Sequence, residues 1–210
     1  MTSQIPMIHL PKFSGFLAAI VCCHLLQAED KKISLDDDQV NQLAAGEVIF
    51  LEPEAGHMLK AVIRIDAPSL LAWEVMSDHE RVPKYVKELR GIRILEEGEN
   101  WKIIEHKLRM HTLLPLFHYA FREEYGPGYS INFERVSGSF KELTGSWKLI
   151  PQEDENHALL VYSTFVDVGW FIPQSWIQKG INKRVPLLLK AFRDEVYSEK
   201  EKRATEEDRQ

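Results

Sequence analysis

The feature that most constrains this fold is a run of strand-like segments in the second half of the chain. Six segments rich in alternating, strand-forming residues follow one another, at 91–96, 101–110, 117–125, 129–136, 143–150 and 159–168. Turn-forming residues such as Gly126-Pro127-Gly128 and Ser137-Gly138 stand between them. Because parallel neighbours need long crossover connections, six strands joined this closely predict an antiparallel meander.

Shorter elements are predicted ahead of the meander. Residues 46–51 and 57–65 have the pattern of two further strands. Pro68 then occupies the first position of a short helix, and residues 79–89 form a second short helical or turn segment. The meander is therefore preceded by strands and two short helices.

One long helix is predicted at the end of the domain, over residues 173–197. Its apolar residues form an amphipathic stripe, and Pro186 should bend it. The stripe consists of Ile177, Ile181, Val185, Leu188, Phe192 and Val196. An antiparallel sheet must bury one face, and this helix is the only predicted element able to cover it. We expect an α+β fold in which a curved antiparallel sheet of about seven strands wraps around this helix and leaves a cavity beside it.

The first 28 residues have the pattern of a secretory signal peptide. Lys12 precedes an apolar run over residues 13–26, and Ala28 precedes the first acidic residue, Glu29. A membrane span needs about 20 apolar residues, and this run is shorter. We expect a cleaved signal and an exported, periplasmic protein, with an uncleaved anchor as the alternative.

The remaining sequence divides into three parts. Residues 29–44 are a polar and loose lead-in, residues 45–197 form the folded domain, and residues 198–210 form a charged, flexible tail. Both cysteines, Cys22 and Cys23, lie in the signal segment. The mature chain would therefore contain no disulfide and no thiol nucleophile.

Composition and motif spacing exclude several kinds of function. The net charge of −6 argues against a nucleic-acid-binding domain, which is normally basic. The chain contains no G-x-S-x-G nucleophile elbow and no phosphate-binding loop. The histidines have no metal-ligand spacing, so we expect them at the surface or at the rim of a pocket, with no metal and no cofactor.

This order of elements and several motifs resemble the START-like helix-grip superfamily, also called SRPBCC. The matching segments are Ile65-Asp66-Ala67-Pro68, residues 73–85, residues 145–151 and Val185-Pro186-Leu187-Leu188. The branch that groups polyketide cyclase/dehydrase and coenzyme-Q-binding START proteins is the most similar. The resemblance covers residues 45–197 and implies a hydrophobic pocket between the sheet and the C-terminal helix. It also implies that lipids, quinones, sterols or polyketides bind there, mostly for transport and in a minority of members for catalysis.

We expect apolar side chains of the sheet and of the helix to face each other across this pocket. On the strands they are Phe117, Tyr119, Phe121, Phe133, Trp147, Tyr162 and Phe165, and on the helix Ile181, Val185, Leu188 and Phe192. Trp170, Phe171 and Trp176 would surround the mouth of the pocket. Tryptophan favours the membrane interface, so these three residues also predict a transient membrane contact. The alternatives are a fully packed core and a simple packing plug.

Four polar residues on the predicted strands are candidates for acid/base chemistry if they point inward. They are Arg109, Arg122, Glu124 and Tyr162. Alternation puts Phe121 on the inner face, which places Arg122 in solvent.

The sequence favours a carrier over an enzyme. We expect the protein to bind, sequester or transfer a hydrophobic small molecule, with a quinone or another isoprenoid first among the ligands that the resemblance implies. Two alternatives remain open at this point. One is an enzyme of the cyclase/dehydratase or aromatase type acting on a polyketide-like substrate, and the other is an interaction protein whose core has closed.

Overall fold

Eight antiparallel strands form one sheet in the computed structural model, which describes residues 33–53, 59–109, 116–169 and 173–209. The strands are β1 (Val48–Leu51), β2 (Leu59–Ile65), β3 (Leu89–Glu97), β4 (Trp101–Leu108), β5 (Phe117–Gly126), β6 (Ser130–Gly138), β7 (Glu142–Pro151) and β8 (Ala158–Asp167). Their order in the sheet is β1-β2-β8-β7-β6-β5-β4-β3. The predicted meander is confirmed, because β3 to β8 are neighbours in chain order, and the sheet has eight strands rather than about seven.

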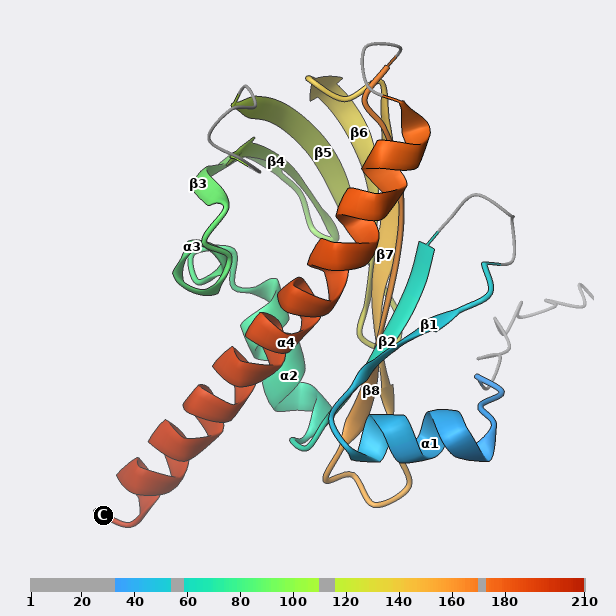
Figure 1. The fold of residues 1–210 in the computed structure, drawn as a ribbon. Coiled ribbons are helices and arrows are strands. Elements are labelled where there is room, and N and C mark those ends of the chain that lie inside the picture. The colour runs from blue at the N-terminus through green and yellow to red at the C-terminus, as the bar shows by residue number, and fades with distance from the viewer. Residues whose placement is uncertain (1–32, 54–58, 110–115, 170–172, 210) are drawn as a thin grey trace, which may run out of the picture. The chain divides into compact units, whose positions relative to one another are not determined.

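Four helices accompany the sheet among the described residues. They are α1 (Asp37–Ala44), α2 (Ser69–Ser77), α3 (Val82–Tyr85) and α4 (Gln174–Glu207). Helix α4 runs diagonally across one face of the sheet, and α2 and α3 lie beside it (Figure 1). We call this the helix-bearing face. The α+β helix-grip arrangement expected from the sequence is therefore present.

The segment predicted as a loose lead-in contains helix α1, which is a correction. Asp36 accepts a hydrogen bond from the Gln39 backbone N–H at 2.8 Å, and the Gln39 side chain accepts one from the Asp36 N–H at 3.1 Å. This reciprocal capping box starts the helix, because it satisfies two backbone donors that have no partner within the helix. The helix is then held by tertiary contact, since Leu43 is buried and α1 contacts β1 and β2.

Helix α4 is longer than predicted and continues to Glu207 instead of ending near Tyr197. Arg203 explains part of the extension, because its guanidinium lies 3.1 Å from the Glu199 carboxylate one turn earlier and 2.7 Å from the Glu74 carboxylate on α2. Residues 198–207 are also mostly strong helix formers. The part of the tail up to Glu207 is therefore helical rather than flexible, and α4 remains one helix through Pro186.

Two apolar clusters lie on the helix-bearing face. The helix-side cluster joins β2, β8, α2 and the part of α4 from Val185 onward, and its members include Ile63, Val75, Leu160, Val185, Leu189, Phe192 and Val196. The aromatic cluster is built around Ile104, Phe117, Phe121, Phe133, Phe140 and Leu143. Trp147 and Tyr162 contact both clusters. The core therefore consists of two clusters on the same face of the sheet, and α4 packs into the helix-side cluster.

Candidate ligand-binding site

Strand register explains how the aromatic cluster forms. Phe121 on β5 is paired with Ile104 on β4, and Glu123 is paired with Phe133 on β6. Phe133 is in turn paired with Gly145 on β7. Directly opposed residues share a face, so the alternating apolar residues of four strands gather on the helix-bearing face.

The rings of this cluster form a continuous series across the sheet. Tyr119 and Phe140 have ring centroids 4.6 Å apart, and Tyr119 and Phe121 are 5.8 Å apart. The series continues from Phe121 to Phe133 at 6.1 Å and from Phe133 to Tyr162 at 6.3 Å. These separations are those of favourable aromatic pairs. The strands therefore present one broad aromatic surface.

Gly145 allows this surface to close over β7. A Cβ atom at this position would collide with the Phe133 ring and with the Ser163 carbonyl oxygen. The Phe133 ring consequently lies across the backbone of the neighbouring strand. A glycine between strand-forming residues is the sequence signal of such a close approach.

Tyr119, Trp147 and Tyr162 lie deep in the protein yet remain partly accessible. Burial raises the pKa values of the Tyr119 and Tyr162 hydroxyls, so both stay protonated. All three side chains nevertheless keep some accessible surface. The surface that these side chains leave accessible is apolar area that a bound ligand could cover.

Most of the predicted sheet residues come together here. Phe117, Tyr119, Phe121 and Phe133 belong to the aromatic cluster or pack against it, and Trp147 and Tyr162 join it to the helix-side cluster. The structure thus places on one face six of the seven aromatic strand residues that the sequence predicts.

Phe165 is the exception and corrects the prediction. It is paired with Thr144 on β7, whereas the inward Tyr162 is paired with Trp147. Residues three apart on a strand point to opposite faces, because side chains alternate with period two. Phe165 therefore lies on the face of the sheet opposite α4 and cannot line a site beneath the helix.

The predicted helix residues belong to the helix-side cluster. Val185 and Phe192 are buried there and Ile181 packs against it, while Trp147 and Phe192 have ring centroids 6.4 Å apart. Leu188 is only half-buried, and Leu189 is fully buried in its place. The buried positions Val185, Leu189, Phe192 and Val196 are spaced by four, three and four residues, so only Leu188 departs from the predicted stripe.

The predicted pocket mouth is described in part. Trp170 and Phe171 lie outside the described residues. Trp176, in the first turn of α4, has 69% of its surface exposed. None of the described side chains from Ser175 to Arg184 is buried. The first part of α4 therefore does not pack tightly against the sheet.

Two histidines lie inside the fold, which corrects the expectation that they are at the surface or at a pocket rim. His79 is 7% exposed, and its Nε2 lies 2.9 Å from Tyr125 Oη and 3.2 Å from a Glu123 carboxylate oxygen. The Tyr125 hydroxyl donates a hydrogen bond to Glu123 at 3.2 Å. His79, Glu123 and Tyr125 thus form a buried, mutually paired acid/base group that the sequence analysis did not identify. Position 123 on the inward phase of β5 was the available signal.

His106 is the second histidine on the inner face, and its side chain is half-buried. Its Nδ1 lies 3.1 Å from Tyr119 Oη, and its ring meets the Phe121 ring edge-on with centroids 4.7 Å apart. Burial lowers its pKa to about 3, and the nearby His79 acts in the same direction. The imidazole is therefore neutral at physiological pH.

Of the four polar residues that the sequence offers for acid/base chemistry, most do not lie on the helix-bearing face. Arg122 and Glu124 form an ion pair at 2.9 Å on the opposite face, and the Arg122 guanidinium lies 4.2 Å from the centroid of the Trp101 ring. The predicted placement of Arg122 outside the core is confirmed. Arg109 continues from β4, where its backbone N–H donates to the Glu88 carbonyl at 2.9 Å. Tyr162 is the one candidate that points inward.

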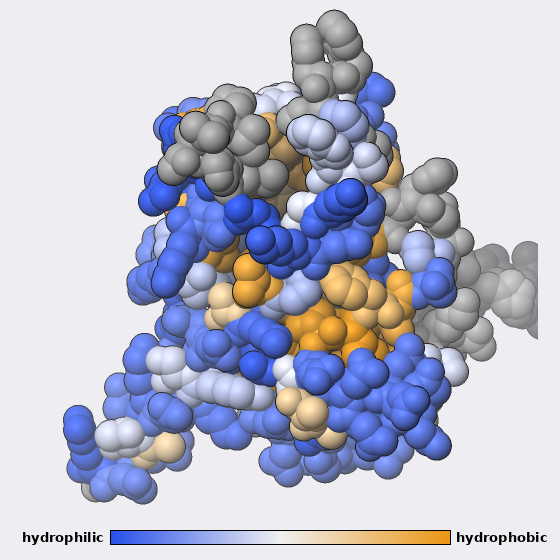
Figure 2. All heavy atoms as spheres, in the orientation of Figure 1, coloured by the Kyte–Doolittle hydropathy of each residue, from blue (hydrophilic) through white to orange (hydrophobic). Residues whose placement is uncertain are grey.

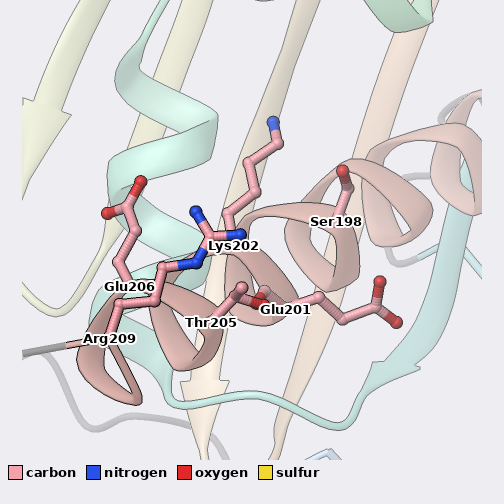
Figure 3. A pocket seen from close by; sticks show the side chains of 6 residues that line it. All are labelled: Ser198, Glu201, Lys202, Thr205, Glu206 and Arg209. Atoms are coloured by element: carbon pink, nitrogen blue, oxygen red, sulfur yellow. The ribbon is translucent and has the colours of Figure 1, made fainter.

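Other possible sites offer less. A depression at the end of α4 is lined by Ser198, Glu201, Lys202, Thr205, Glu206 and Arg209 (Figure 3). All six come from the end of α4 and the two residues that follow it, so no second element encloses a ligand there.

Metal sites and membrane-spanning helices were also possible. In the described part of the chain, no three potential metal ligands come together. No helix within that part is long and apolar enough to span a membrane.

Comparison with known proteins agrees with this architecture. Residues 65–193 match the family described as polyketide cyclase / dehydrase and lipid transport, and the chain belongs to this family. The resemblance inferred from the sequence motifs is confirmed. Membership supports either hydrophobic ligand binding or cyclase chemistry. Among proteins with curated functions, none matches the sequence significantly.

Solved structures share the fold at low sequence identity. A START superfamily protein from Mycobacterium smegmatis has a TM-score of 0.60 at 18% identity, covering 68% of this chain and 99% of its own. The Zhui aromatase/cyclase from Streptomyces has a TM-score of 0.60 at 16% identity, covering 67% and 93%. A STAR-related lipid transfer protein from Xanthomonas axonopodis has a TM-score of 0.56 at 16% identity, covering 71% and 92%.

Proposed function

We propose that this protein binds a hydrophobic small molecule between the aromatic cluster and the first half of α4, and that it sequesters or transfers this molecule. One observation carries the proposal. The buried residues of α4 begin at Val185, while the aromatic surface beside its first half keeps Tyr119, Trp147 and Tyr162 partly accessible. An apolar ligand would cover this accessible surface. Each Å² of apolar surface removed from water would contribute about 25 cal/mol of binding free energy. A quinone or another isoprenoid is our first candidate.

The proposal is tested by asking what the protein carries. Protein purified from its own host without detergent is analysed by native mass spectrometry, and bound material is extracted into organic solvent and identified. We expect a lipid or quinone close to one per protein. A clean apoprotein mass, together with no binding of the hydrocarbon probe diphenylhexatriene, would contradict the proposal.

Transfer also requires contact with a membrane, and the outer face of α4 supports it. Trp176 and Leu187 are 69% and 59% exposed, and Lys179, Lys183 and Lys190 are exposed on the same side of the helix. Residues 174–193 contain five basic residues and no acidic residue, although the whole chain has a net charge of −6. In Figure 2 the first half of α4 is hydrophilic at its surface. Exposed tryptophan and leucine among lysines suit an anionic bilayer.

Vesicle co-sedimentation tests this contact. We expect binding to vesicles that contain anionic lipid, and loss of binding in Lys179→Glu/Lys183→Glu and in Trp176→Ser. The matched control Lys202→Glu/Arg209→Glu makes the same charge change at the exposed end of α4. An equal loss of vesicle binding in the control would mean that the net charge of the protein, and not this part of α4, causes the binding.

Export forms part of the proposed function, because the predicted signal peptide would deliver the carrier to the periplasm. Mass spectrometry of the protein from its host is expected to show a mature chain that begins at Glu29. A chain that retains residues 1–28 in the membrane fraction would favour the anchor instead.

A cyclase or dehydratase is the second candidate function, and the buried His79–Glu123–Tyr125 group favours it. A carboxylate and an imidazole within 3.2 Å of each other can accept and return a proton beside a bound substrate. Glu123→Gln separates the two functions. It should abolish turnover of a poly-β-ketone substrate if the protein is an enzyme, and it should leave diphenylhexatriene binding intact if the group is structural.

A further inference from the structure

Among the described residues, His106 carries a buried nitrogen without a hydrogen-bond partner, beside the Tyr119 and Phe121 rings at the β4 end of the aromatic surface. The residue is paired with Tyr119 across β4 and β5 and faces the helix-bearing side. Its Nδ1 is engaged by the Tyr119 hydroxyl at 3.1 Å. Its Nε2 is buried, and no group in the described part of the chain hydrogen-bonds to it. Buried polar atoms are nearly always paired, so an exception inside a candidate ligand site indicates a role for the missing partner.

The Tyr119 hydroxyl determines which imidazole nitrogen carries the proton. Burial raises the pKa of Tyr119, so its O–H is present and must donate to an acceptor. Nδ1 of His106 is the acceptor within reach. If Nδ1 were protonated instead, both the phenol O–H and the Nε2 lone pair would be unpaired. The arrangement with fewer orphan groups has the proton on Nε2.

We propose that the Nε2–H of His106 donates a hydrogen bond to the ligand, and that the ligand is a neutral hydrophobic molecule with a carbonyl oxygen. The inference rests on the proposed function and adds the chemical class of the ligand. Aromatic rings around a single directed donor suit a quinone or ketone, whose oxygen needs one partner and whose remaining surface needs none.

The charge of the site favours a neutral ligand over a fatty acid. His106 is uncharged at physiological pH, because its pKa is lowered to about 3. A carboxylate beside it would be buried among aromatic rings without a counter-charge, which is strongly unfavourable. The nearby His79 already has Glu123 and Tyr125 as partners.

Access to Nε2 requires only a local movement. The atom itself is covered, while the His106 and Tyr119 side chains are partly accessible. Movement of the side chains that cover Nε2, with the Nδ1–Tyr119 contact kept, would open the N–H to an entering oxygen. Tyr119 acts as a positioning residue, because it holds the tautomer that donates.

Two fluorescent probes test the proposal on the full chain. Laurdan is a naphthyl ketone with a twelve-carbon acyl chain, and diphenylhexatriene is a hydrocarbon without an oxygen atom. We expect His106→Phe to weaken Laurdan binding about three- to tenfold while the Kd of diphenylhexatriene changes little. Laurdan emission should also shift to the blue, because its carbonyl loses a hydrogen bond. His118→Phe is the matched control, since His118 is exposed on the neighbouring strand β5.

The outcomes separate this inference from the proposed function. If neither probe binds the wild-type protein, the proposed function fails. If both bind and His106→Phe reduces their affinities equally or not at all, the His106 role is overturned while the function stands. His106→Gln keeps an N–H donor, so partial recovery of Laurdan affinity supports hydrogen bonding and no recovery contradicts it. Nitrogen-15 shifts of the imidazole give the tautomer directly, and protonation at Nδ1 would overturn the assignment.

Discussion

At His106, burial opposes protonation, and stability should therefore depend on pH. The folded-state pKa is about 3, below the value of 6.5 that an exposed histidine has. As the pH falls below 6.5, His106 binds a proton in the unfolded chain but stays neutral in the folded protein. The free energy of unfolding then decreases by up to about 1.4 kcal/mol per pH unit down to pH 3, whereas above pH 6.5 the residue has no such effect.

Urea unfolding between pH 7.5 and 4.5 measures this contribution. Relative to wild type, His106→Phe should gain stability steadily below pH 6.5. His118→Phe should follow the wild-type slope, because its side chain is exposed. Parallel curves for wild type and His106→Phe would show that His106 is protonated in the folded state.

The opposite faces of Phe133 and Phe165 give a second prediction at this scale. Phe133 is 8% exposed within the aromatic cluster, and Phe165 lies on the other side of the sheet. Phe133→Ala should cost about 3–5 kcal/mol and weaken diphenylhexatriene binding. Phe165→Ala should leave the affinity for this probe unchanged, and a loss comparable to that of Phe133→Ala would place Phe165 in the site.

Among the elements, α1 depends most on a local signal. Its capping box at Asp36 and Gln39 starts a helix of only eight residues, which would be marginal alone. Asp36→Ala should destabilise the helix by about 1 kcal/mol, measured as faster amide exchange in residues 37–44. Asp38→Ala, an exposed change in the first turn, is the control. Unchanged exchange in Asp36→Ala would mean that Leu43 packing alone holds α1.

Helix α4 combines two environments in one element. Its second half is buried in the helix-side cluster and is tied to the α2–α3 region by Arg81, whose guanidinium lies 2.7 Å from the Glu199 carboxylate. This contact lowers the pKa of Glu199 and raises that of Arg81. Its first part contributes no buried side chain from Ser175 to Arg184, although Arg184 forms an ion pair with Glu88 at 2.6 Å. One end of the helix is therefore held firmly while the other borders the ligand site.

For the whole molecule, a ligand that completes the core should raise thermal stability. Binding only to the folded state adds about 2.7 kcal/mol at a free ligand concentration one hundred times the Kd. Laurdan should therefore raise the Tm in a concentration-dependent way. The rise should be smaller in His106→Phe at equal Laurdan concentration, whereas diphenylhexatriene should stabilise both proteins equally. A Tm independent of either probe would argue that the site is closed in the folded state.

The sequence by itself determined the strands, the helix start near Pro173 and the face on which most aromatic residues lie. These features depend on local periodicity, turn residues and alternation, which neighbouring residues specify. Phe165 shows that aromatic character alone does not fix the face of a strand residue, because strand phase places it opposite Tyr162. The tertiary structure alone decided the division into two clusters and the meeting of His79 with Tyr125, 46 residues apart. Such contacts depend on how distant elements pack, and no local pattern encodes that Nε2 of His106 is buried without a hydrogen-bond partner among the described residues.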